Sequence, residues 1–190
     1  LNYKHKQIDK ADFHIQRLLP RKLSENNPKI SSIDANGDGR EDFIIHGPDG
    51  ESPLLFTQDP SGKFASTPLF GLASIEKATI DDHTVFDIDK DGDADVLFLF
   101  NYDDYRNNRY YGKIIVLKNN GKGDFEEDHT LFPVLNSQAH LLQPIDANND
   151  GHLDLFVAGK TKIQSYPFAD PSYFFENKEK FQKLIDVITE

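Results

Sequence analysis

The chain has 190 residues, of which 37% are hydrophobic and 12% aromatic, contains no cysteine, and carries a formal net charge of −11. This apolar content excludes a disordered chain, and the absence of cysteine excludes disulfides and thiolate metal sites. No run approaches the roughly 20 apolar residues of a membrane span, and the acidic charge argues against nucleic acid and anionic membrane surfaces as partners.

The first 28 residues precede the repeated part of the chain and are predicted to form a leader or first-strand segment, residues 1–28. Within it, Phe13–Leu19 has the spacing of a short turn of helix. The chain begins at Leu1 and not at Met, which indicates a processed or trimmed piece of a longer protein.

Three nine-residue segments align without gaps and define an internal repeat. They read DANGDGRED from Asp34, DIDKDGDAD from Asp87 and DANNDGHLD from Asp146. Their starts lie 53 and 59 residues apart. This spacing is far longer than that of the nonapeptide calcium β-rolls, which it excludes.

Strand-like stretches recur around each segment. An extended stretch precedes it, at Lys29–Ile33, His83–Phe86 and His140–Ile145. An apolar run follows, at Asp42–His46, Asp95–Phe100 and Asp154–Ala158. A third stretch comes next, at Pro53–Thr57, Lys113–Lys118 and Ser172–Glu176, and a turn with a Phe closes the unit, at Ser61–Phe64, Gly121–Phe125 and Asn177–Phe181.

Four strands in each unit, at a period of about 50–60 residues, are typical of β-propeller blades. The apolar runs are hydrophobic on both faces, which predicts strands buried on both sides. The sequence therefore predicts an all-β fold of about three four-stranded blades, residues 29–70, 71–130 and 131–190, as part of a larger propeller. Phe181–Ile188 also has some helical spacing.

The repeated segments have the pattern of calcium loops. Asp or Asn at positions 1, 3 and 5 directs alternate side chains toward one centre, and Gly at position 6 permits the sharp turn. The backbone carbonyl of position 7 and the Asp of position 9 complete a shell of oxygen ligands, which calcium prefers. The predicted ligands, for up to three Ca²⁺, are Asp34, Asn36, Asp38, Arg40 and Asp42; Asp87, Asp89, Asp91, Asp93 and Asp95; and Asp146, Asn148, Asp150, His152 and Asp154.

The same loop pattern has three other interpretations: an EF-hand, a magnesium site and an acidic turn without metal. A helical EF-hand needs Glu at position 12, where this chain has Ile45, Phe98 and Val157. Magnesium fits less well because it prefers strict octahedral geometry and retains its waters. An acidic Asx-turn hairpin that holds no metal remains open.

The loop pattern and the strand after it resemble the FG-GAP/VCBS repeat of integrin-α-type β-propellers. The stretches FHIQRLLPRKLS, YYGKIIVLKNNGKGDF and DLFVAGKTKIQSYPFADPSYFFEN resemble bacterial VCBS-repeat proteins related to the cartilage-acidic-protein (ASPIC/UnbV) group. The resemblance implies an exported or surface-attached protein, extracellular or in the bacterial envelope. Because the family's propellers have more blades than three, it also implies a fragment, or a partner that covers open blade edges.

Residues suited to catalysis are not grouped in a known motif. The seven histidines (His5, His14, His46, His83, His129, His140 and His152) have no zinc spacing, and His46 and His140 are interpreted as structural. No nucleophile elbow, P-loop or dinucleotide fingerprint is present. The polar stretch Asn101–Gly112 and the turn Tyr166–Pro171 are candidate recognition surfaces, with solvated connecting loops as the alternative.

The predicted function is a calcium-binding, non-catalytic extracellular or cell-surface module that binds a protein or glycan partner. An alternative is a structural subunit of a larger extracellular assembly, in which another chain covers the blade edges. A third interpretation is part of an enzyme whose active site lies in further blades, which no residue of this chain supports.

Overall fold

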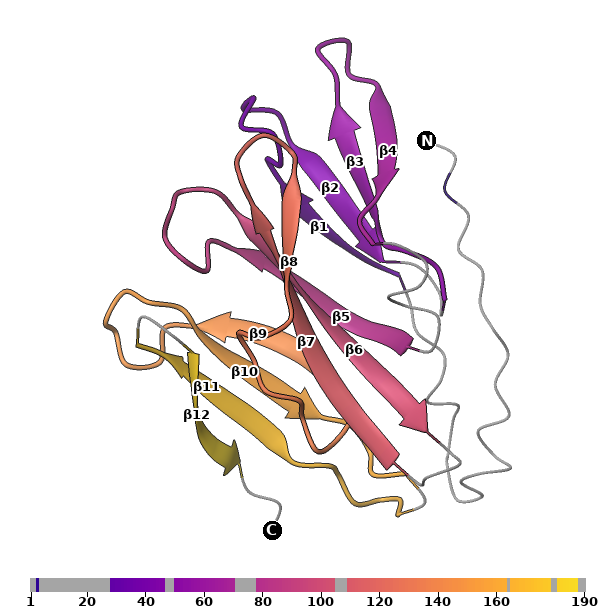
Figure 1. The fold of residues 1–190 in the computed structure, drawn as a ribbon, viewed down its shortest axis with the longest axis vertical. Coiled ribbons are helices and arrows are strands. Elements are labelled where there is room, and N and C mark those ends of the chain that lie inside the picture. The colour runs from indigo at the N-terminus through magenta and orange to yellow at the C-terminus, as the bar shows by residue number, and fades with distance from the viewer. Residues whose placement is uncertain are drawn as a thin grey trace.

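Three antiparallel sheets of four strands each make up the described part of the chain in the computed structural model (Figure 1). The described residues are 3, 28–46, 50–70, 78–104, 109–163, 165–178 and 181–187. The first sheet contains β1 (Lys29–Ile33), β2 (Asp42–His46), β3 (Leu54–Gln58) and β4 (Phe64–Pro68). The second contains β5 (Ala78–Phe86), β6 (Asp95–Asp104), β7 (Arg109–Asn119) and β8 (Phe125–Asp128). The third contains β9 (Ala139–Ile145), β10 (Asp154–Gly159), β11 (Ser172–Asn177) and β12 (Phe181–Val187).

The all-β prediction with four strands in each unit is confirmed. Within every sheet the strands pair in chain order, as in a meander. The helical alternative for Phe181–Ile188 is wrong, because β12 pairs along β11 and supplies backbone hydrogen bonds that a helix would keep to itself. Each sheet falls within one predicted blade range, although the blade boundaries themselves stay predictions. The predicted segment 1–28, with its turn of helix, lies outside the described residues except for Tyr3 and Pro28.

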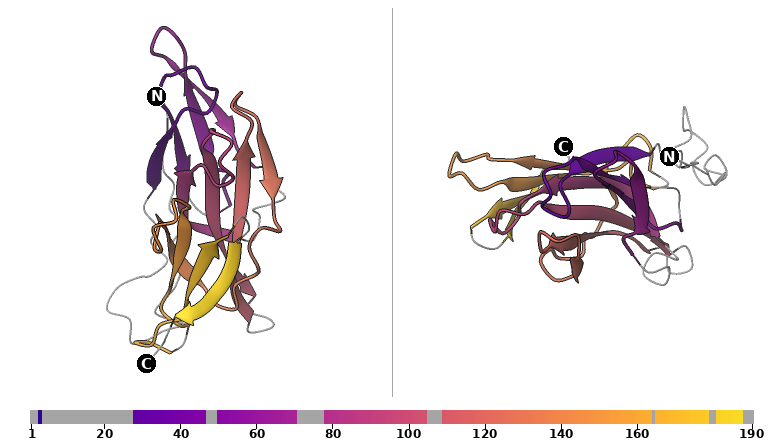
Figure 2. Two further views of the ribbon diagram at one scale, coloured as in Figure 1. Left: turned by 90° about the vertical axis from the view of Figure 1, so that its left-hand side faces the viewer. Right: turned by 90° about the horizontal axis from the view of Figure 1, so that it is seen from above.

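The second sheet lies between the other two and is buried on both faces, as its apolar runs predicted. Along β6, Val96, Phe98 and Phe100 pack toward the first sheet, whereas Leu97 and Leu99 pack toward the third. Successive side chains of a strand point to opposite faces, so one strand serves two cores. Figure 2 shows the resulting order along the long axis, with the first sheet (indigo to purple) at one end and the third (orange to yellow) at the other.

The first strands of the three sheets are neighbours, and Asp82 in β5 connects all three. Its Oδ1 accepts a hydrogen bond from Lys29 Nζ of β1 at 2.7 Å, and its Oδ2 accepts one from the Leu142 N–H of β9 at 2.7 Å. A register shift between Ile80 and Asp82 marks a bulge that turns the preceding residue, Asp81, toward Lys160 Nζ at 2.6 Å. Two adjacent carboxylates of β5 thereby join the second sheet to β1 of the first sheet and, in the third sheet, to β9 and to the connection that follows β10.

The described part of the chain contains no helix with the length and apolar character needed to cross a bilayer.

Two histidines meet in the core between the first and second sheets. His46 Nδ1 of β2 lies 2.8 Å from His83 Nδ1 of β5, and both side chains are buried. One Nδ1 must therefore carry a proton and the other must not. His83 also stacks on Phe98 at 5.4 Å between ring centroids. Burial, followed by the neighbouring His46 and Lys29, lowers the pKa of His83 from 6.5 to about 3.

We expect acid to destabilise the fold through His83. The unfolded chain binds a proton at this imidazole below about pH 6.5, whereas the folded chain does so only below about pH 3. The free energy of unfolding should therefore fall with decreasing pH across this window, by up to about 1.4 kcal/mol per pH unit from this group. Urea unfolding at several pH values measures the slope.

The matched variants are His83→Asn, which should flatten this slope, and His140→Asn, which changes an exposed imidazole and should keep it. Equal slopes in wild type and His83→Asn would contradict the prediction.

Candidate metal centre

The three predicted metal loops occupy equivalent places in the three sheets. Each joins the first strand of a sheet to its second: residues 34–41 between β1 and β2, 87–94 between β5 and β6, and 146–153 between β9 and β10. All three project toward the same side of the molecule, the left of Figure 1. The repeat in sequence is thus a repeat in space.

The aspartate at position 1 organises each loop by accepting backbone hydrogen bonds. In the first loop, Asp34 accepts from the N–H groups of Asp38 at 3.1 Å and Gly39 at 2.8 Å. Asp146 accepts in the same way from Asp150 at 3.1 Å and Gly151 at 3.0 Å. In the middle loop, Asp87 accepts from Lys90 at 2.7 Å and Gly92 at 3.0 Å. Each of these carboxylate oxygens keeps a further lone pair for a ligand.

The aspartate at position 9 fastens each loop to its sheet. In the middle sheet, the buried Asp95 accepts from the N–H of Ile88 with Oδ2 and from the N–H of Asn119, at the end of β7, with Oδ1, both at 2.9 Å. Asp42 and Asp154 do the same, at distances between 2.7 and 3.2 Å. The sequence assigned this position to the metal shell, and the structure adds a clamp between the loop and the third strand.

The middle loop brings three predicted ligands together. Carboxylate oxygens of Asp87, Asp89 and Asp95 all lie within 4.8 Å of one another. Burial, and then the negative charges of Asp89 and Asp91, raise the pKa of Asp95 to about 6 against the lowering effect of its two backbone N–H donors. The one cation that an ion pair brings to this group within the described residues is Lys118, whose Nζ lies 3.2 Å from Asp89 Oδ2. This geometry leaves negative charge that a cation would neutralise.

The outer loops are arranged differently. In the first loop, the guanidinium of Arg40 forms an ion pair with Asp38 and donates from Nε to the Gln58 carbonyl at 3.1 Å. In the third, the Asn148 amide donates to Asp150 Oδ2 at 2.9 Å and to Glu176 Oε1 at 3.3 Å. Within the described residues, three acidic or histidine ligands gather only in the middle loop. The ligand set as a whole, including the carbonyls of Arg40, Asp93 and His152, stays a prediction.

Sequence reasoning missed the contacts that the tight turn between β7 and β8 makes with two of the loops. A Cβ on Gly121 would lie 2.5 Å from Asp93 Oδ2 of the middle loop, and a Cβ on Gly37 of the first loop would lie 2.9 Å from the Gly121 carbonyl. Gly121 also has a left-handed φ of +69°. The sequence predicts this turn only as the end of a blade, and no signal in the nine-residue motif points to these contacts.

The loops also share a left-handed residue at position 4, which was not predicted from the sequence. Gly37, Lys90 and Asn149 there have φ values of 69°, 63° and 59°. Gly and Asn adopt this conformation readily and Lys does not. Two Gly or Asn residues among the three at this position were the available signal.

Each of the two candidate recognition surfaces contains residues whose contacts stabilise the fold. Asn101 is buried and exchanges hydrogen bonds with Ala139, donating to its carbonyl at 2.6 Å and accepting from its N–H at 3.1 Å. This residue therefore joins the second sheet to the third. The tip at Tyr166–Pro171 is held by a bridge between Thr161 and Ala169, and Phe168 is 70% exposed there. Residues 105–108 of the polar stretch lie outside the described residues.

Comparison with known protein families bears on the same loops. Residues 34–98 match the FG-GAP-like repeat. The match begins at the first aspartate of the first loop and ends within β6, so it includes the first and middle loops and covers about a third of the chain. None of the curated proteins compared with the chain matches it. The predicted repeat type is confirmed over this stretch, whereas the closer likeness to the ASPIC/UnbV group stays a prediction.

We expect Asp95→Asn to destabilise the protein without any metal. One of the two backbone N–H groups that face Asp95 would then meet an amide NH₂ instead of an acceptor, at a cost of about 1–3 kcal/mol. Urea unfolding in chelator at about pH 8, where the Asp95 carboxylate is ionised, measures the loss. The exposed Asp89, changed to Asn, is the control and should leave this free energy nearly unchanged. Equal losses in both variants would contradict the clamp.

We expect Gly121→Ala to destabilise the protein more than Gly62→Ala. Both glycines have a left-handed φ, +69° and +80°, and share that strain of about 1–2 kcal/mol. Only at Gly121 does the new Cβ collide with Asp93, because nothing lies within 4 Å of a Cβ on Gly62. The difference between the losses of unfolding free energy in the two variants measures the contact with Asp93. Equal losses would show that the turn does not constrain the middle loop.

Proposed function

We propose that this protein is a calcium-binding, non-catalytic interaction module of the FG-GAP repeat type. The observation that carries the proposal is the group formed by Asp87, Asp89 and Asp95 on a loop whose backbone is already folded around the Asp87 carboxylate. Asp91 and the Asp93 carbonyl would complete the shell.

The donor set favours calcium over other metals. All the candidate donors in the middle loop are oxygens, which suit hard cations, and the described loop offers neither thiolate nor imidazole. Calcium accepts irregular shells with about six to eight ligands, whereas magnesium demands a near-ideal octahedron. Burial and the neighbouring negative charges both raise the pKa of Asp95. A cation there would favour the charged carboxylate against both effects, so the ion and the fold would stabilise each other.

The proposed role of the metal is structural. A cation bound to these carboxylates would hold them ionised and occupied, which suits them poorly to proton transfer. The loops sit on a rigid scaffold, and connections beside them are free to contact a protein or glycan partner. FG-GAP repeats are typically extracellular, and we place this module outside the cell or on its surface. The first and third loops would hold two further calcium ions.

Thermal unfolding with calcium and with chelator tests the proposal. If the ion binds only the folded chain, a concentration of 100 times the Kd adds about 2.7 kcal/mol for each site. We expect a higher midpoint in calcium for the wild type. The variant Asp89→Asn should lose the contribution of the middle loop and keep the wild-type midpoint in chelator.

The matched control is Asp59→Asn. Asp59 is an exposed aspartate whose Oδ1 also accepts backbone hydrogen bonds, from Ser61 at 2.8 Å and Lys63 at 3.0 Å, but it lies in the turn between β3 and β4. This variant should keep the full calcium response. Identical midpoints of the wild type in calcium and in chelator would refute the proposal and leave the loops as acidic turns.

A further inference from the structure

An aspartate, a lysine and an asparagine meet where the second sheet joins the third. Asp81 lies at the bulge of β5, Asn101 lies in β6, and Lys160 directly follows β10. The Oδ1 atom of Asp81 accepts a hydrogen bond from Lys160 Nζ at 2.6 Å, and its Oδ2 atom accepts one from the side-chain amide of Asn101. One carboxylate therefore holds an amine and a carboxamide at the same time.

The group lies at the edge of the core between the two sheets. The side chain of Asp81 is 4% exposed, that of Lys160 is 21% exposed, and Asn101 is 3% exposed. Leu97, Leu99 and Asn101 are alternate residues of β6 and point to the same face of the sheet, where both leucines line the core. Water is largely excluded from such a place, and the electrostatic interactions within the group are stronger there than in water.

The carboxamide of Asn101 is held and polarised by one backbone unit. Its Oδ1 atom accepts a hydrogen bond from the Ala139 N–H at 3.1 Å, and its Nδ2 atom donates to the Ala139 carbonyl at 2.6 Å. A backbone N–H in this position stabilises the negative charge that develops on the oxygen when a nucleophile adds to the carbon. Gly112, the cross-strand partner of Asn101, leaves room for this side chain, because a Cβ on Gly112 would lie 3.3 Å from Oδ1.

The backbone of Lys160 is fixed on both sides. Its N–H donates to the Gln138 carbonyl at 3.0 Å, and its carbonyl accepts from the Asp170 N–H at 2.7 Å. An amine becomes a nucleophile only when it loses a proton, and the Asp81 carboxylate is the base in contact with it. Because amine and carboxamide lie on the same carboxylate, their reaction would be intramolecular, which strongly favours it.

We propose that Lys160 and Asn101 form an isopeptide bond and that Asp81 is the catalytic residue. Lys160 Nζ attacks Cγ of Asn101, the Nζ–Cγ bond forms, and the Cγ–Nδ2 bond breaks. Asp81 passes protons from Nζ to Nδ2, so the ammonium nitrogen becomes an amide nitrogen and the carboxamide nitrogen leaves as ammonium. The step needs no oxidant, metal or further reactant. It occurs once in each chain, so it is compatible with a module that turns over no substrate.

The bond would join the second sheet to the third across their junction. It would close a loop of chain from residue 101 to residue 160, and a cross-link of this kind stabilises a protein largely by restricting its unfolded state. The chain has no cysteine. An isopeptide bond would supply a covalent link by a route that does not depend on oxidation.

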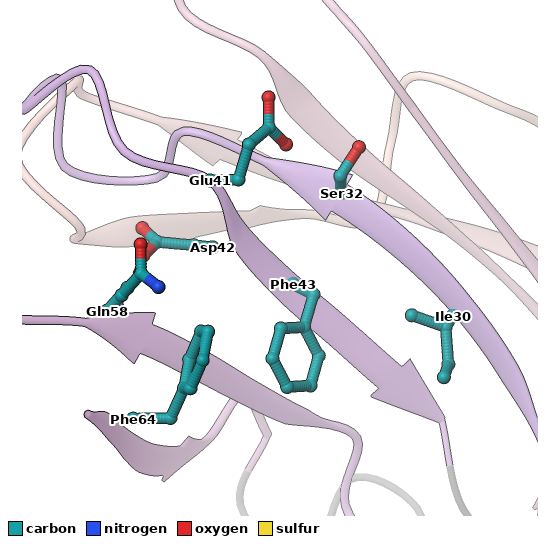
Figure 3. A pocket seen from close by; sticks show the side chains of 7 residues that line it. All are labelled: Ile30, Ser32, Glu41, Asp42, Phe43, Gln58 and Phe64. Carbon is teal, nitrogen blue, oxygen red and sulfur yellow. The ribbon is translucent and has the colours of Figure 1, made fainter. Parts of the chain in front are cut away.

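Two other places in the described sheets contain only part of this group. Lys29 pairs with Asp82 at 2.7 Å, but the other oxygen of Asp82 accepts from the backbone N–H of Leu142 and not from a carboxamide. Gln58 lies beside Asp42 in a groove of the first sheet (Figure 3), and the residues that line this groove include no lysine. The pair of Lys29 and Asp82 therefore provides a matched control.

The intact mass of the purified and denatured chain tests the proposal, which does not depend on metal binding. The wild type should weigh less than its sequence mass by one molecule of ammonia. A tryptic digest should contain a branched peptide that carries both Asn101 and Lys160. The variants Lys160→Arg and Asp81→Ala should have their full sequence masses, whereas Lys29→Arg should keep the ammonia loss.

Two controls exclude other causes of these masses. Asn–Gly sequences also lose ammonia when they cyclise to an imide, and this chain has Asn36–Gly37 and Asn120–Gly121. Mild base hydrolyses an imide but leaves an isopeptide bond intact. Far-UV circular dichroism shows whether each variant is folded, and the branched peptide of the wild type decides the question even where a variant does not fold.

Four results would overturn the proposal. A folded wild type with its full sequence mass would show that the bond does not form. Loss of water in place of ammonia, with a branched peptide that carries Asp81 and Lys160, would show that the amine attacks the carboxylate. An ammonia loss that persists in Lys160→Arg would show an imide at an Asn–Gly sequence. A branched peptide retained in Asp81→Ala would show that Asp81 is not the catalytic residue.

Discussion

Each sheet depends on one buried aspartate. One of its carboxylate oxygens accepts a hydrogen bond from the acidic loop, and the other accepts one from the end of the third strand. Asp95 shows the arrangement most fully, because it joins the loop residue Ile88 to Asn119 at the end of β7. Both partners are backbone N–H groups, which would be costly to leave unpaired in a buried place. The Asp95 carboxylate therefore stabilises the fold without a metal, and any cation that it helps to bind would meet a loop that is already formed.

In the middle loop, Asp95 is both the buried clamp and a candidate metal ligand, and these two roles have opposing electrostatic requirements. The same burial that makes Asp95 a good clamp disfavours its charge, and Asp89 and Asp91 add negative charge nearby. In the outer loops, other groups reduce the repulsion between carboxylates: the Arg40 ion pair in the first loop and the Asn148 amide in the third. The middle loop has only the exposed Lys118 contact among its described ion pairs. The three loops share one sequence pattern but thus differ in how strongly a divalent cation would stabilise them.

The sequence was sufficient to predict the features whose information is local. The aspartate spacing predicted the loops. The stretches that recur around the loops predicted four strands in each sheet, and the apolar runs predicted the burial of β6 on both faces. Helical spacing at Phe181–Ile188 was misleading, because pairing with β11 outweighs local preference there. The contacts of Asp82 with Lys29 and Leu142, the histidine pair and the approach of Gly121 to Asp93 join residues from 28 to 60 positions apart. Such contacts are set by the way sheets stack, which no short motif encodes.

The connections at the two ends of the strands differ in how tightly their length is fixed. At the end with the acidic loops, all three connections have eight residues, from 34 to 41, 87 to 94 and 146 to 153. At the opposite end, the connections between the second and third strands have seven, four and twelve residues, at 47–53, 105–108 and 160–171. The hydrogen bonds to the aspartate at position 1, such as those to Asp34 and Asp146, recur from loop to loop at the first end. At the opposite end, the described part of the connection 160–171 has a different set, such as that from the Asp170 N–H to the Lys160 carbonyl at 2.7 Å. An insertion at the opposite rim would consequently leave the repeated hydrogen bonds of the acidic loops intact, whereas an insertion within one of those loops would break them.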